Sequence, residues 1–83
     1  MTGLAQYLAE RLASRPELVS VELEAGAARP VVVIRAHQED IPEILGRRGR
    51  TVRAIRALYA VYAAKTGRRA EISVNPLPPE EAP

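Results

Sequence analysis

Hydrophobic residues near the start of the chain recur with the spacing of a helix. Leu4, Leu8 and Leu12 are four residues apart, and a helix places side chains at this spacing on one face. The pattern predicts an amphipathic helix over residues 4–14, with the three leucines facing the core. Pro16 prevents that helix from continuing, because it lacks an amide donor.

Three later segments have the patterns of β-strands. Residues 18–24 alternate between apolar side chains and Ser or Glu, which predicts a half-buried strand. Residues 31–34 are four consecutive β-branched residues, which indicates a more buried strand that pairs with the first as a hairpin. Residues 69–74 alternate again and predict a third strand.

Two helices are expected between the second and third strands. Asp40 suits the N-cap of a short helix that starts at Ile41 and stops at Gly46. A long helix then runs from about residue 50 to Thr66, and Gly67 ends it. The order α-β-β-α-α-β predicts an α+β fold in which three helices pack on one face of a three-stranded sheet.

The 83 residues suffice for one domain, which we place at residues 1–75. Residues 76–83 are rich in proline and predict a flexible tail. No apolar run approaches the length of about 20 residues that crosses a bilayer, so we expect no contact with a membrane. The first residues also lack the apolar segment of a signal peptide, so the expected location is the cytoplasm.

The composition argues against an enzyme and against a metal or cofactor site. The chain has no cysteine and one histidine, His37, which excludes sites built from thiolates or from several imidazoles. The carboxylates Glu39, Asp40 and Glu43 are explained by the start of the short helix, where negative charge is favourable. Phe and Trp are absent, so a surface of stacked aromatic rings for nucleic acid is not expected.

Basic residues are concentrated in one segment, although the net charge is only +2. Between Leu45 and Ala70 there is no Asp or Glu, and eight of the twelve basic residues lie there. Such a segment indicates an acidic partner, most simply a phosphate backbone. The alternative is a solvated helix face that happens to be basic.

At the start of this segment, two glycines enclose two arginines. Gly46-Arg47-Arg48-Gly49 lies between the short and the long predicted helices. Glycines permit a tight turn and the close approach of a ligand backbone. The start of the long helix adds its positive dipole end, and the arginines are placed to reach phosphates. The spacing does not fit a nucleotide-binding P-loop, which has four residues between its glycines and then a lysine.

With its flanking residues, this loop resembles the core pattern of the KH domain. The pattern is an aliphatic pair, a Gly-x-x-Gly loop and an aliphatic residue three positions further, here Ile44-Leu45, residues 46–49 and Val52. The order of elements is similar to the type II KH arrangement. The run over residues 49–56 and the small size look like the bacterial single-KH proteins of the KhpA group. The resemblance covers residues 4–75, and Leu45 replaces the more usual Ile or Val.

The resemblance implies binding of single-stranded RNA, with about four nucleotides held at the loop, and a role as an RNA chaperone or post-transcriptional regulator. Bases would lie in an aliphatic groove between the helix pair and the strand over residues 32–35. Ile55 and Leu45 fit a plain core position as well as the groove. The residues expected at the RNA are Gly46, Arg47, Arg48, Gly49, Arg50, Arg53, Ile44, Leu45, Val52, Ile34 and Arg35.

A second hypothesis from the residues is a protein-interaction or dimerisation module, such as a ribosome-assembly accessory, in which RNA binding is secondary. Residues 57–64 of the long helix carry no charge, and the stripe from Val52 to Tyr62 already supplies a core face. Leu58 and Val61 point elsewhere, and cover by the first helix is the alternative to a partner. The KhpA-like resemblance favours a homodimer through Leu58, Val61 and Tyr62, and implies pairing with a larger KH-containing protein.

Overall fold

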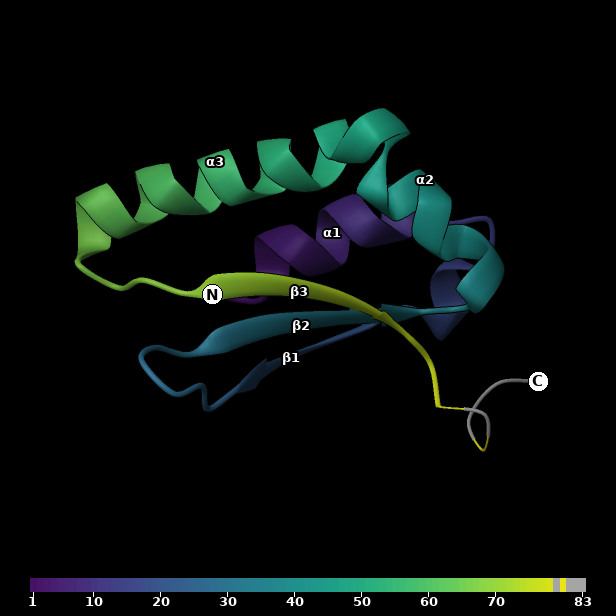
Figure 1. Ribbon diagram of the computed structural model, residues 1–83, viewed down its shortest axis with the longest axis horizontal. Coiled ribbons are helices and arrows are strands. Elements are labelled where there is room, and N and C mark those ends of the chain that lie inside the picture. The colour runs from purple at the N-terminus through teal and green to yellow at the C-terminus, as the bar shows by residue number, and fades with distance from the viewer. Residues whose placement is uncertain (79, 81–83) are drawn as a thin grey trace.

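A three-stranded sheet carries all three α-helices on one face in the computed structural model, which describes residues 1–78 and 80 (Figure 1). This arrangement confirms the predicted α+β fold and the order α-β-β-α-α-β. The helices and strands, in chain order, are α1 (Gly3–Leu12), β1 (Ser20–Glu24), β2 (Val31–Ala36), α2 (Ile41–Leu45), α3 (Arg50–Thr66) and β3 (Glu71–Pro76). Short 3₁₀ turns occupy Pro16–Leu18, Gln38–Asp40 and Arg47–Gly49.

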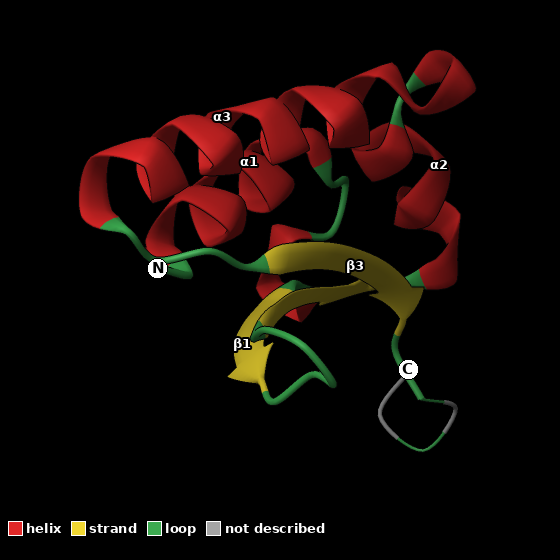
Figure 2. Cartoon of the chain, turned by 60° about the vertical axis from the view of Figure 1, so that its left-hand side comes forward, coloured by secondary structure: helices red, strands yellow, loops and turns green. Residues whose placement is uncertain are grey.

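The central strand is β2, which pairs antiparallel with β1 and parallel with β3. Ile34 lies opposite Val21 on one side and Val74 on the other. Because neighbouring strands in register present aligned side chains to the same face, this row faces the helices. The parallel pairing requires a crossover, and α2 and α3 supply it above the sheet, as Figure 2 shows.

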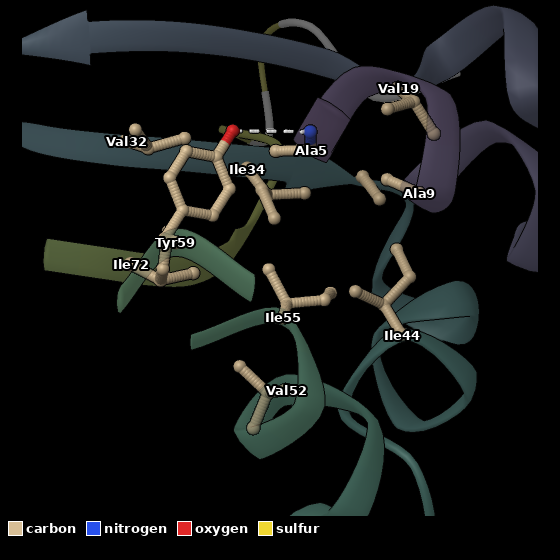
Figure 3. Packing of buried hydrophobic residues seen from close by; sticks show 11 residues of the cluster. Ala5, Ala9, Val19, Val32, Ile34, Ile44, Val52, Ile55, Tyr59 and Ile72 are labelled. Atoms are coloured by element: carbon tan, nitrogen blue, oxygen red, sulfur yellow. Dashed lines mark hydrogen bonds between the residues drawn. The ribbon is translucent and has the colours of Figure 1, made fainter. Parts of the chain in front are cut away.

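The core lies between the sheet and the helices (Figure 3). Val32 and Ile34 of β2 are fully buried, and Ile44 of α2 and Ile55 of α3 pack toward them from the helix side. On α3, the buried residues fall at positions 52, 55 and 59, which confirms the predicted core stripe, while Tyr62 is only half-buried. Burial of a large aliphatic side chain contributes about 1.5–3 kcal/mol, so these few contacts hold the layers together.

The prediction that three leucines form the buried face of α1 was only partly correct. Ala5 and Ala9 are the buried residues of α1, whereas Leu4 is 40% exposed. Leu8 and Leu12 are partly buried at the edge of the core. Small side chains at the contact let the helix backbone approach the sheet closely, so the alanines define the inner face and the leucines flank it.

A tyrosine from α3 replaces the missing cap of α1. The N-cap position of α1, Thr2, makes no side-chain hydrogen bond to the helix. Instead the hydroxyl of Tyr59 accepts a hydrogen bond from the amide of Ala5 at 3.2 Å and donates one to the carbonyl of Met1. Burial raises the pKa of Tyr59 above its ordinary value of 10.0, and the bond from Ala5 partly opposes this rise. The phenol therefore links the first turn of α1 to the middle of α3.

Asp40 occupies the N-cap position of α2, as predicted, but its side chain does not cap the helix. The carboxylate is 2% exposed and accepts hydrogen bonds from the amides of Ser14 and Arg15, at 3.2 and 3.1 Å. The Arg15 guanidinium lies 3.8 Å away and also pairs with Glu39 at 2.9 Å. Asp40 thus fixes the turn after α1 against the start of α2, because a buried carboxylate is stable only when its oxygens are bonded.

The C-terminal strand extends further than the sequence pattern indicated. β3 starts at Glu71 and includes Pro76, and the amide of Leu77 donates to the carbonyl of Ala36 at 2.9 Å. The predicted flexible tail falls partly on residues 79 and 81–83, which lie outside the described residues, and it stays a prediction. Among the helices that the structure describes, none is both long and apolar enough to span a membrane.

Candidate nucleic-acid interface

The loop between α2 and α3 has a backbone that is left-handed at three of its four residues. Gly46 has φ 79°, Arg48 φ 55° and Gly49 φ 74°. Two of these positions are glycines, which adopt such angles freely, whereas Arg48 is the one positive-φ residue other than glycine in the described chain. A non-glycine residue there costs about 1–2 kcal/mol, and strain of this kind is concentrated at ligand clamps and active sites.

Both residues between the glycines point into solvent. Arg47 and Arg48 are exposed, as is Arg50 at the start of α3. Arg53, one turn into α3, lies over the loop: a Cβ atom on Gly49 would be 3.1 Å from its Nη1 atom. Four guanidinium groups therefore surround a loop that stands at the positive end of α3.

None of these arginines has a carboxylate partner among the described residues. The ion pairs found there involve Arg15, with Glu39 and Asp40, and Arg35, with Glu24 at 3.0 Å. The basic residues from 47 to 69 have no such contact. The charge predicted from the sequence is consequently available to an acidic ligand. The described residues also contain no group of three or more His, Asp or Glu side chains that would hold a metal ion.

The aliphatic residues predicted for the RNA groove divide into two groups. Ile34 and Ile44 are fully buried, and Val52 is 5% exposed, so all three belong to the core. Leu45, beside the loop, is half-buried and packs on the edge of the core. Leu45 alone of these side chains lies both next to the loop and within reach of solvent.

Arg35 lies on the opposite face of the sheet from the loop. It follows Ile34 along β2, and successive side chains of a strand point to opposite faces. Because Ile34 faces the helices, Arg35 points to the open face, where it pairs with Glu24 of β1. Glu24 pairs with Val31, which is four residues before Arg35 on β2. The Arg35 side chain therefore extends along the strand past Val33, whose exposed fraction is only 4%. The structure therefore does not bring Arg35 together with residues 46–49.

The strand that borders the exposed side of α3 is β3 and not β2. A surface hollow of about 240 Å³ lies between the C-terminal half of α3 and the start of β3. A second hollow, of about 390 Å³, shares Arg56 and Ala70 with the first and continues over Glu71 and Ile72. Sequence reasoning did not select Arg56, although it stands one turn beyond Arg53 on the same helix face.

The residues predicted for a dimer interface lie on another side of α3. Leu58 and Val61 are 46% and 54% exposed, so α1 does not cover them. Tyr62 is half-buried and meets the ring of Tyr59 edge-on, with centroids 6.3 Å apart. The core-facing side of α3 is already packed, so this exposed apolar pair is a surface on which a partner could bind.

The family described as "KhpA/KhpB, KH domain" matches residues 2–74 of this sequence. That range contains every element from α1 to Val74 of β3 and includes the Gly46–Gly49 loop. The chain belongs to the KhpA/KhpB KH-domain family. The predicted resemblance to a KH domain of the KhpA group is thereby confirmed.

A curated relative supports the same assignment. The chain is 34% identical over 71 residues to the RNA-binding protein KhpA of Borreliella burgdorferi, a match that covers 86% of this chain and 87% of the relative. The match therefore spans most of this chain and most of the relative.

Solved structures of Era have the same fold. Era of Aquifex aeolicus bound to GDP and AlF₄⁻ superposes with a TM-score of 0.61 at 20% identity, and covers 96% of this chain. Era in complex with MgGDPNP and nucleotides 1506–1542 of 16S ribosomal RNA gives a TM-score of 0.60 at 21% identity. The chain spans 31% of the length of each Era protein, so the likeness concerns one domain of a larger molecule.

Proposed function

We propose that this protein binds single-stranded RNA by clamping the sugar-phosphate backbone at the Gly46–Gly49 loop. The observation that carries the proposal is the loop itself, in which a left-handed backbone presents Arg47 and Arg48 to solvent without carboxylate partners. The relative from Borreliella burgdorferi, named as an RNA-binding protein, supports the same ligand.

Gly49 gives the ligand close access to the protein backbone. No side chain at this position stands between the loop and an approaching phosphate, whereas Gly46 lets the loop pack against Thr51. The amide groups at the start of α3 lie directly behind, with the partial positive charge of the helix end. A phosphodiester placed over the loop therefore meets backbone donors first and guanidinium groups at its sides.

The arginines supply affinity without base selection. Arg47, Arg48, Arg50 and Arg53 all lie at or one turn from the loop, and guanidinium groups bind phosphate oxygens in a planar, two-pronged geometry. Contacts of this type position a nucleic acid but do not read its sequence. Leu45 is the half-buried aliphatic side chain next to the loop, so we assign the first base contact to it.

Weak and sequence-tolerant binding of this kind suits an RNA chaperone or a post-transcriptional regulator in the cytoplasm. One domain that holds about four nucleotides engages many different RNA segments. Single strands are favoured because a KH-type groove accepts unstacked bases, which a duplex does not expose.

Charge reversal at the loop tests the clamp. In the Arg47→Asp, Arg48→Asp variant we expect most binding of labelled single-stranded RNA to be lost, with an unchanged circular dichroism spectrum and thermal midpoint. Both side chains point into solvent, and Asp is tolerated in the left-handed conformation of residue 48. A matched control is Arg11→Glu with Lys65→Glu, which changes the net charge equally at exposed sites outside the loop. If the folded loop variant binds as the wild type does, or the control loses as much affinity, the clamp is disproved.

A second proposed property is self-association through α3. Leu58 and Val61 expose about half of their surface. We propose a homodimer joined at these residues, with Tyr62 at the border of the contact. A larger KH-containing protein would use the same apolar face. Two linked domains would bind one RNA more tightly than a single weak domain.

A further inference from the structure

β1 is an edge strand whose outer backbone groups have no partner in the described chain. The strand order is β1-β2-β3, so β1 pairs on one side only, with β2. Every second residue of such a strand directs its amide and carbonyl away from the sheet. Apart from the ladder with β2, no hydrogen bond among the described residues reaches the backbone of residues 20–24. In Figure 1 the helices lie above the sheet and β1 is its lower border, so this edge is open to a further strand.

The usual devices that block an exposed edge are missing from β1. Natural edge strands are commonly protected by proline, by lysine or by a β-bulge. Residues 20–24 are Ser-Val-Glu-Leu-Glu, and all five pair with β2 in a continuous register. The other edge strand, β3, differs because it ends in Pro76 and borders α3. Two glutamates are therefore the only charges that protect the edge of β1.

The two faces of β1 offer different chemistry to an added strand. Val21 and Leu23 face the helices, because their partners on β2 are fully buried. Glu22 and Glu24 point the opposite way, onto the open face of the sheet. Glu24 is paired with Arg35 at 3.0 Å, whereas Glu22 makes no ion pair within the part of the chain that the structure describes. An added strand meets aliphatic side chains on one face and negative charge on the other.

A surface hollow adjoins the exposed aliphatic side chain of β1. Leu23 is 48% exposed and lines a hollow of about 460 Å³ together with Met1, Pro30, Arg68 and Arg69. On the helix face, the side chain of an added strand beside Leu23 stands at the mouth of this hollow. Two arginines in the wall repel a basic side chain there, so an aliphatic side chain is favoured.

A second copy of the same strand fits this edge poorly. In an antiparallel β1–β1 pair centred on Glu22 or on Leu23, glutamates of the two copies stand directly opposite each other. Like charges in this position destabilise a strand pair, whereas opposite charges stabilise it. Charge complementarity therefore favours a strand that carries lysine or arginine over a copy of this chain.

We propose that the outer edge of β1 binds an extended segment of another protein in which basic and aliphatic residues alternate. The basic side chains lie against Glu22 and Glu24 on the open face. The aliphatic side chains lie beside Val21 and Leu23 on the helix face, with the last of them at the hollow. Main-chain hydrogen bonds supply affinity and the alternating side chains supply specificity. This surface is separate from the Gly46–Gly49 loop and does not depend on RNA binding there.

A labelled peptide of about seven residues, in which lysine and valine alternate, tests the edge on the full-length protein. We expect saturable binding, with changed amide signals and slower hydrogen exchange at residues 20–24 in NMR spectra. A peptide of the same composition with its lysines and valines in two blocks should bind about tenfold more weakly, because it cannot match both faces at once. A version that is N-methylated along its backbone should not bind, because it has no amide donors.

Two variants of β1 separate the charged face from the aliphatic one. Glu22→Lys reverses the unpaired charge at an exposed position, and we expect it to weaken binding of the lysine–valine peptide about tenfold and to strengthen binding of a glutamate–valine peptide. Glu43→Lys makes the same change in net charge at an exposed position of α2 and should do neither. Leu23→Gln keeps the length of the side chain but not its aliphatic surface, and it should weaken the lysine–valine peptide. Thermal melting verifies that each variant is folded.

The opposite results identify another occupant or none. No binding of the alternating peptide, equal binding of the alternating and block peptides, amide changes centred outside residues 20–24, or equal losses in Glu22→Lys and Glu43→Lys overturn the proposed site. If the lysine–valine peptide converts a dimer into a monomer in sedimentation, β1 joins two copies of this chain, and a different protein as the occupant is disproved.

Discussion

Gly46 lies so close to Thr51 that no side chain fits between them. A Cβ atom on Gly46 would be 2.2 Å from Oγ1 of Thr51 and 2.6 Å from its backbone nitrogen. The loop therefore closes directly onto the first turn of α3. Glycine is required here by space as well as by its φ of 79°.

This contact predicts unequal effects at the two glycines of the loop. Gly46→Ala should lower the free energy of unfolding by about 3 kcal/mol, because the new atom collides with backbone and the φ angle is unfavourable. Gly49→Ala should cost about 1 kcal/mol, since it meets only the flexible end of Arg53. Urea denaturation of the two variants measures the difference, and equal losses would contradict the contact.

The strain at Arg48 predicts a conflict between stability and binding. Arg48→Gly should raise the free energy of unfolding by about 1 kcal/mol, because glycine adopts a φ of 55° without cost. The same change should weaken RNA binding, because one cation is lost. Arg47→Gly is the matched control, since Arg47 is not left-handed, and it should weaken binding without any gain in stability.

The hydroxyl of Tyr59 predicts a dependence of stability on alkaline pH. Its pKa is raised in the folded protein, so above pH 10 the unfolded chain loses its proton first and stability falls until the folded pKa is passed. Tyr59→Phe should remove this contribution to the loss of stability at alkaline pH. At neutral pH the same change should lower the free energy of unfolding by about 1–2 kcal/mol, because the buried amide of Ala5 loses its acceptor. Chemical denaturation on both sides of pH 10 tests both effects, with Tyr7→Phe, an exposed site, as control.

The exposed arginines predict a strong dependence of RNA affinity on salt. Each phosphate contact to a single strand contributes about −0.7 to the slope of log affinity against log salt, so three to five contacts give a slope of about −2 to −3.5. Duplex RNA of the same length should bind more weakly. Equal affinity for duplex and single strand would indicate a general basic surface in place of a KH groove.

Leu58→Glu tests the proposed dimer. Leu58 is 46% exposed, so a charge there does not enter the core and the domain should stay folded. At an interface the unpaired charge would cost several kcal/mol and produce a monomer with weaker apparent RNA affinity. Sedimentation and thermal melting measure both properties. A folded variant that still sediments as a dimer would remove this face from the interface, and Ala57→Glu, on a neighbouring exposed position, is the control.

Periodicity and glycine placement in the sequence were enough to predict the order of the elements and the position of the loop. The long helix is bounded by Gly49 and Gly67, and these local signals need no tertiary context. The core stripe of α3 was likewise predictable, because a surface helix buries the one face that its apolar residues define.

The inner face of α1 was not predictable in the same way. Leu4, Leu8 and Leu12 form the more hydrophobic stripe, yet Ala5 and Ala9 are buried, since close packing on the sheet favours small side chains over large ones. The role of Asp40 was also not predictable from local sequence. Its position before α2 could be predicted, but its hydrogen-bond donors are amides more than twenty residues away in the chain.

The loop and its arginines are local in sequence, and the sequence by itself determined them. The arrangement around the α3–β3 hollow depends on contacts between distant segments, and only the tertiary structure decided it. Arg29, Arg56 and Arg69 share that hollow because β2 lies parallel to β3, which places the β1–β2 turn beside the end of α3. Strand order and direction are set by how the whole set of apolar faces packs, and no short segment of the chain encodes that information.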